Sequence, residues 1–123
     1  MNLQIKNYLN STEWKAMFGS QALGLSLVKN NNFAADILHF QPNTQTILHT
    51  HPGNHILFVV DGSGWLFFDN AMHILSVGDC YFVPGDIPHQ VGTDNTILYL
   101  LSIADDHRPV DSPERLQEVI NHG

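Results

Sequence analysis

The chain has 123 residues, the size of one ordinary domain, and its 43% hydrophobic and 14% charged residues are typical of a globular protein. Its formal net charge of −7 excludes unaided binding of nucleic acid, which depends on Lys and Arg neutralising phosphates. Cys80 is the only cysteine, so no intramolecular disulfide can form. The sequence shows neither a signal peptide nor an apolar run of membrane-spanning length, and we expect a cytoplasmic protein that does not contact a membrane.

The first 21 residues predict an N-terminal arm with one short helix. Ser11 or Thr12 is a suitable N-cap for the segment "EWKAMF", and Gly19 stands where a helix can end. From residue 22 onward the pattern changes to short apolar segments that alternate with turn residues.

These apolar segments predict the strands of an all-β sandwich or barrel, because they follow one another without intervening helical patterns. In the segment "HILFVV", His55, Leu57 and Val59 share one face, and the residues between them make a second apolar face. One face would line the barrel, and a second sheet, a partner subunit or the N-terminal segment would cover the other. Because several strands are apolar on both faces, we expect a homodimer. The predicted strands are 22–28, 33–40, 46–51, 55–60, 64–68, 72–77, 79–84, 89–92 and 96–103.

The end of the chain predicts a helix over residues 112–122. Ser112 can cap it, Pro113 suits the first turn, and Leu116, Val119 and Ile120 form one apolar stripe. We therefore expect a single domain over residues 1–123, with a core barrel at about 22–104, an N-terminal arm at 1–21 and a C-terminal helix that packs on the barrel.

Three histidines crowd the segment "HTHPGNH". His49 and His51 point to the same side of an extended segment, and a turn at Gly53 or Asn54 would bring His55 back beside His51. Unpaired imidazoles packed together inside a barrel are costly unless a shared metal ion takes up their lone pairs. The spacing therefore favours a metal site.

The sequence resembles the cupins, small β-barrels marked by two motifs. The first motif is a glycine, five residues, His-x-His, three or four residues, a glutamate, six residues and a glycine. In this chain Asn43 replaces the first glycine, His49 and His51 follow, His55 stands in place of the glutamate, and Gly62 is at the expected distance.

The second cupin motif matches the segment "GDCYFVPGDIPHQVGT". Gly78, Pro84 and His89 occupy motif positions, whereas Asp86 replaces a glycine and Thr93 an asparagine. Both Asn43 and Asp86 belong to the residue types that best tolerate glycine-like backbone conformations. The resemblance therefore implies a small, single-domain cupin barrel of the jelly-roll type, with short helical segments at both ends.

The resemblance also implies a metal centre with four histidine ligands, His49, His51, His55 and His89, as in cupins in which the glutamate is replaced. Imidazole ligands suit Mn, Fe, Ni, Zn and Cu, so the ligand set does not name the divalent transition metal. Two alternatives stay open, a three-histidine site with His55 in a supporting position and a metal-free polar pocket.

The predicted function is that of a metal-dependent oxidoreductase, similar to a dioxygenase or an oxidase. No Lys or Arg occurs between residues 30 and 107, which disfavours anionic substrates and with them sugar-phosphate isomerases and oxalate-type decarboxylases. An arginine from outside that range, such as Arg108 of a second subunit, would undo this argument. A small substrate that chelates the metal through oxygen atoms fits the predicted site best.

The alternative function is a non-catalytic module that binds a metal or a small ligand, for example as a sensor. A purely structural metal fits poorly with a fold that has a large apolar core. The sequence places neither Asp36 nor Asp86 in the pocket, so the enzyme hypothesis assigns no residue to proton transfer.

Overall fold

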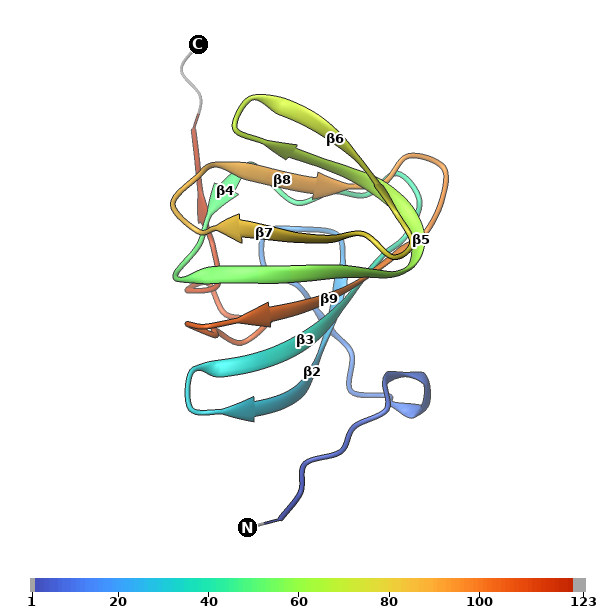
Figure 1. Ribbon diagram of the computed structural model, residues 1–123, viewed down its shortest axis with the longest axis vertical. Coiled ribbons are helices and arrows are strands. Elements are labelled where there is room, and N and C mark those ends of the chain that lie inside the picture. Colours follow the sequence, from blue (N-terminus) through green and yellow to red (C-terminus); the bar gives the residue numbers. More distant parts are fainter. Residues whose placement is uncertain (1, 121–123) are drawn as a thin grey trace.

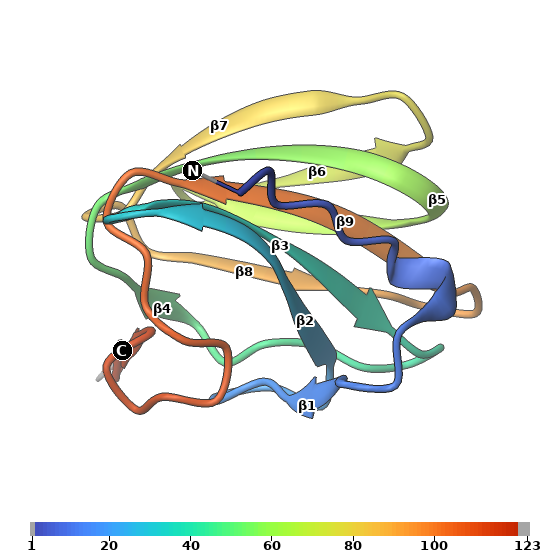
Figure 2. The ribbon, with the colours of Figure 1, turned by 90° about the horizontal axis from the view of Figure 1, so that it is seen from below.

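The structure, a computed structural model that describes residues 2–120, consists of two curved β-sheets that face each other and share one long strand (Figures 1 and 2). The order in the first sheet is β1-β2-β3-β9-β5-β7, and in the second β5 pairs with β6 and β8, followed by β4 and β10. The strands are β1 Lys15–Ala16, β2 Leu23–Asn30, β3 Phe33–Phe40, β4 His49–Thr50, β5 Asn54–Phe68, β6 Ala71–Ser76, β7 Cys80–Pro84, β8 His89–Gly92, β9 Leu98–Ala104 and β10 Gln117–Glu118.

Strand β5 joins the two sheets because it bends in its middle. Its first half pairs with β7 and β9, and its second half pairs with β6 and β8. The register against β9 shifts between Val59 and Asp61, and Gly62 has a φ of 78° at a place where a Cβ atom would collide with the carbonyl oxygen of Ile97. The sequence-based prediction of two strands at 55–60 and 64–68 is therefore wrong, since one bent strand covers both.

The core lies between the two sheets and is formed by alternate residues of the strands. Leu57 and Val59 of β5 point inward and are buried, as the alternation predicted. Ile56 and Phe58, on the outer face of the same strand, remain 46% and 40% exposed in the single chain. The homodimer that would cover this face stays a prediction.

The predicted N-terminal helix is not found. A 3-10 turn at Tyr8–Asn10 and the short strand β1 take its place. β1 pairs with the open edge of β2, with Lys15 opposite Gly24, so the sheet satisfies backbone groups that a helix would otherwise have bonded internally. Gly19 does reverse the chain, with a φ of 74°.

The predicted C-terminal helix over 112–122 is also wrong for the described residues 112–120, and residues 121 and 122 lie outside the description. Ser112 caps only one turn, since its hydroxyl accepts a hydrogen bond from the backbone N–H of Glu114 at 3.1 Å. The chain then extends as β10 along the open edge of β4. This pairing places the C-terminal segment beside β4 (Figure 2), the strand that carries His49.

Among residues 2–120, no helix is long and apolar enough to cross a membrane.

Candidate metal centre

Three histidines form a compact group inside one end of the barrel. His49 on β4 lies directly opposite His89 on β8, with ring centroids 4.4 Å apart, and His51 follows β4 with its centroid 4.6 Å from that of His89. Each offers one ring nitrogen, and these three nitrogens all lie within 4.8 Å of one another. Such spacing allows one ion to contact all three.

The backbone fixes two of these rings in the orientation that a metal requires. His49 Nδ1 lies 2.6 Å from the carbonyl oxygen of Ile47, and His89 Nδ1 lies 2.8 Å from that of Ile87. A carbonyl oxygen can only accept, so both Nδ1 atoms carry the proton and both Nε2 atoms keep their lone pair. The histidine in a metal site is commonly held in this way by its second nitrogen.

His51 reaches the group because two turns pack closely against each other. Its backbone N–H donates a 2.9 Å hydrogen bond to the carbonyl oxygen of Gly85, and a Cβ atom on Gly85 would collide with the backbone of His51 and Gly53. Gly53 has a φ of 67°, which confirms the predicted left-handed turn after His51. The first-motif Asn43 likewise has a φ of 57°, whereas Asp86 is not among the described residues with a positive φ.

The fourth predicted ligand, His55, lies in the same cavity but outside the group of three. Its ring stacks on His51 with centroids 4.0 Å apart, and its Nδ1 lies 3.1 Å from the hydroxyl of Ser102 on β9. The turn after His51 brings the two rings together without a hairpin, because β4 pairs with β8 and the start of β5 pairs with β7 and β9. His49, His51, His55 and His89 together are called the histidine pocket below.

Burial keeps these imidazoles neutral in the absence of metal. Burial, reinforced by neighbouring histidines, lowers the pKa of His49 to about 3, of His51 to about 4 and of His55 to about 2. Burial also lowers the pKa of His89. Neutral imidazoles are the form that binds a metal ion, so the donor set fits a divalent transition metal at physiological pH.

The cavity beside the histidines is small and has mainly apolar walls. Its volume of about 40 Å³ is enough for an ion with about three waters, or for a small ligand that displaces them. No Asp or Glu is found among the residues that line it in the described part of the chain. The apolar walls come from Met17, Leu38, Phe40, Leu57, Val83, Val91, Leu100 and Leu116.

An arginine also lines the cavity. The absence of Lys and Arg between residues 30 and 107 therefore does not exclude anionic substrates, contrary to the expectation from the sequence. Arg115 belongs to the C-terminal segment, and its side chain is 5% exposed. Its Nη1 donates to Asp36 Oδ2 and to the carbonyl oxygen of Arg108, both at 2.9 Å. His107 Nε2 donates to the same Asp36 oxygen at 2.9 Å, so Asp36 is buried beneath this pair.

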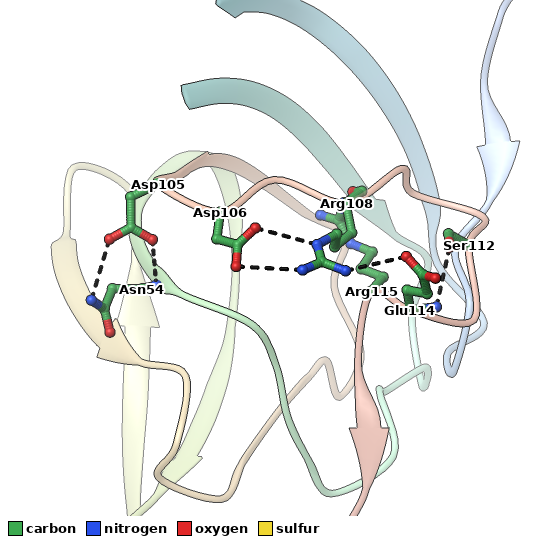
Figure 3. A network of polar contacts seen from close by, with 7 residues as sticks. All are labelled: Asn54, Asp105, Asp106, Arg108, Ser112, Glu114 and Arg115. Carbon is green, nitrogen blue, oxygen red and sulfur yellow. Dashed lines mark hydrogen bonds and ion pairs between the residues drawn. The ribbon is translucent and has the colours of Figure 1, made fainter. Parts of the chain in front are cut away.

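A network of polar contacts holds the segment that carries Arg115 in place (Figure 3). Asp105 accepts hydrogen bonds from the backbone and side chain of Asn54, at 2.7 and 3.3 Å, and Arg108 contacts both Asp106 and Glu114. Asn54 begins the strand that carries His55, so the network ties the C-terminal segment to the histidine pocket.

Sequence reasoning missed two residues of this cavity, Arg115 and Tyr81. Arg115 was assigned to the predicted C-terminal helix that packs on the barrel. No pattern in the sequence indicates that its side chain lines the cavity. Tyr81 lies two residues before the buried Val83 in the strand predicted at 79–84, so the alternation of that strand would have placed Tyr81 on the inner face.

Comparison with known proteins identifies the family. The cupin domain matches residues 36–103, more than half of the chain, and the chain belongs to the cupin family. Among curated proteins, no significantly similar sequence was found.

Several solved structures share the fold over most of the chain. A cupin-like protein from Thermotoga maritima has 22% sequence identity and a TM-score of 0.66, covering 94% of this chain and 89% of its own. The polyketide cyclase RemF from Streptomyces resistomycificus has 21% identity and a TM-score of 0.74, covering 95% and 87%. A predicted oxalate decarboxylase from Thermotoga maritima has 21% identity and a TM-score of 0.65, covering 74% and 88%. At these identities the likeness shows the common fold alone.

Proposed function

We propose that the protein is a metal-dependent oxidoreductase, similar to a dioxygenase or an oxidase, that acts on a small organic substrate able to chelate the metal. The observation that carries the proposal is the group of three ring nitrogens from His49, His51 and His89 in a buried, apolar cavity. When bound there, a divalent transition metal would supply a Lewis acid and open positions for ligands.

Redox chemistry is favoured over proton-transfer chemistry by what lines the cavity. Reactions such as isomerisation need a general base, and the described lining contains no carboxylate. The lining histidines are committed to the metal in this proposal, and neutral imidazoles accept redox-capable ions. Because Arg115 lines the cavity, substrates that carry a negative charge are included.

We further propose His55 as a fourth ligand. Its Nδ1 is occupied by the Ser102 hydroxyl, so its Nε2 is the nitrogen available to the cavity that it shares with His51. Removal of a supporting group costs about 10–100-fold in metal affinity. The variant His55→Ala is therefore expected to bind metal more than about 100-fold more weakly, and a smaller loss would assign His55 to a supporting role.

The test of function combines elemental analysis with oxygen uptake. Protein purified from metal-replete cells is expected to carry near-stoichiometric Fe or Mn, with Ni or Cu as the other redox-capable ions, and to consume oxygen with a small enol or diketone. His51→Ala should abolish both properties. The matched control is His73→Ala, because His73 lies on β6 away from the histidine pocket and is exposed.

The second candidate is a non-catalytic protein that binds a small ligand at the same metal. The small volume of the cavity favours it, because a cavity of about 40 Å³ accepts few substrates beside an ion. Bound metal without oxygen uptake, together with stabilisation by a chelating ligand, would replace the oxidoreductase proposal with this one.

A further inference from the structure

Tyr81 carries a buried hydroxyl without a hydrogen-bond partner. Its Oη is inaccessible to solvent, and no described residue accepts or donates to it. A buried hydroxyl of this kind costs free energy in the folded protein, so it calls for an explanation. One explanation is a ligand that supplies the missing partner.

The position of Tyr81 directs its side chain toward the histidine pocket. On β7 it lies opposite Leu57 of β5, and directly opposed residues of an antiparallel pair point to the same face. Leu57 and Val83, the next residue of that parity on β7, are both buried in the core. Tyr81 lines the same cavity as the four histidines, and it also lines a second hollow together with Leu66, Leu75 and Phe82.

Arg115 gives this cavity a source of positive charge besides a metal. Asp36 and the carbonyl oxygen of Arg108 occupy only Nη1 of its guanidinium, which has five N–H donors in all. Arg115 lines the same cavity as Tyr81 and the four histidines, so its positive charge lies next to any ligand that the cavity holds. An anionic ligand would therefore meet a hydroxyl donor and a fixed cation in an apolar cavity.

We propose that Tyr81 is a ligand-binding residue whose hydroxyl donates a hydrogen bond to a carboxylate oxygen of a small chelating ligand, with Arg115 favouring the negative charge. This inference deepens the proposed function and rests on it, because it names the class of ligand, a small carboxylate. The cavity volume of about 40 Å³ restricts that ligand to a few non-hydrogen atoms. Glycolate is a suitable probe, and its neutral isostere glycolamide is the matched comparison.

The first test measures stability without metal. Tyr81→Phe removes only the hydroxyl, and since that hydroxyl has no partner in the protein, the urea midpoint of the metal-free variant is expected to equal or exceed that of the wild type. A clearly lower midpoint would overturn the proposal, because it would show that the hydroxyl is bonded within the protein. The matched control is Tyr99→Phe, which alters a tyrosine outside the cavity.

The second test measures binding to the Co²⁺-loaded protein through its visible absorption. In Tyr81→Phe the affinity for glycolate is expected to fall about tenfold or more, and that for glycolamide clearly less, because hydrogen bonds to charged groups are about twice as strong as neutral ones. Any preference that the ion itself has for a carboxylate is present in both proteins and cancels in the comparison.

The outcomes separate the two proposals. Normal Co²⁺ uptake with unchanged glycolate affinity in Tyr81→Phe overturns the role of Tyr81 and leaves the metal site intact. Failure of the wild type to take up Co²⁺ overturns the metal-dependent function and this inference with it. Loss of Co²⁺ binding by Tyr81→Phe would also overturn the inference, because it would make the hydroxyl part of the metal site.

Discussion

Two regions of the barrel pack histidines against other rings, and they use them differently. In the histidine pocket four imidazoles face one cavity, and two of them are held by backbone carbonyl oxygens. On β3, His39 instead stacks on Tyr99 with centroids 4.1 Å apart and planes at 7°, and Trp14 packs against both rings. Burial lowers the pKa of His39 as it does in the pocket.

The difference shows that burial and a lowered pKa do not identify a metal ligand. His39 Nε2 is also buried without a hydrogen-bond partner, but the rings that pack against His39 belong to Trp14 and Tyr99, and no second His, Cys or carboxylate joins them in a metal group among the described residues. The pocket histidines have one another within ligand distance. What distinguishes a metal centre is therefore the convergence of several lone pairs, and His39 acts as one member of an aromatic cluster.

The largest expected effect is a loss of metal affinity, which should follow a substitution in the histidine pocket but not one in the aromatic cluster. His49→Ala should reduce metal affinity by several hundredfold or more, beyond the 10–100-fold typical of supporting groups, because it removes one of three converging nitrogens. His39→Phe keeps an aromatic ring on Tyr99 and should leave metal affinity unchanged. Competition titration with a chelator measures both, and equal losses in the two variants would remove the distinction.

The next effect concerns the buried ion pair between Arg115 and Asp36 beside the histidine pocket. The aromatic cluster of His39 has no such ion pair among its contacts with the described residues. Arg115→Met leaves the buried carboxylate of Asp36 with His107 as its remaining side-chain partner, and such a change costs about 3 kcal/mol or more. Arg108→Met is the control, since its ion pairs are partly exposed and worth at most about 1 kcal/mol. Urea unfolding measures both, and a similar small loss in each would show that Asp36 does not depend on Arg115.

The pH dependence of the metal-free protein gives a smaller effect. The pocket histidines have a lower pKa when folded than their ordinary value near 6.5, so the unfolded chain binds more protons below that pH. The free energy of unfolding should therefore be highest above pH 6.5 and fall as the pH decreases toward about 4, the pKa of His51. Urea unfolding at pH 7.5, 6 and 5 tests this, and His51→Ala should flatten the decrease more than His39→Phe does.

The smallest expected effect lies in the aromatic cluster. Trp14→Leu retains an apolar side chain but loses edge-on contacts with His39 and Tyr99, whose geometry is worth about 0.5–1.5 kcal/mol per pair. The melting temperature should fall by a few degrees, with metal affinity unchanged. A change in metal affinity would mean that the two regions are coupled.

The repeating short apolar segments predicted most of the strands but not β1, β10 or the continuity of β5, because alternation and turn residues are local properties of the chain. The local spacing predicted two members of the metal group, His49 and His51, whereas His89 lies far along the chain and was predicted only by the resemblance to the second cupin motif. The two helices were predicted wrongly because the open edges of β2 and β4 offer backbone hydrogen bonds that no local pattern reveals.

The position of Arg115 could not be predicted, because it follows from that same edge pairing. β10 pairs with β4, and the two residues before β10, Arg115 and Leu116, consequently line the cavity. The bend of β5 escaped prediction for a different reason. The segment "DGSG" has the composition of a hairpin, and only the close approach of Ile97 requires the bent strand at Gly62.

The most direct test of the account is anomalous X-ray diffraction from crystals of the metal-loaded protein, recorded on both sides of the absorption edge of the ion. The account predicts one ion per chain, in contact with the Nε2 atoms of His49, His51 and His89, while Nδ1 of His49 and His89 stays on the carbonyl oxygens of Ile47 and Ile87. An ion bound elsewhere, or a pocket that holds only water after metal loading, would contradict it.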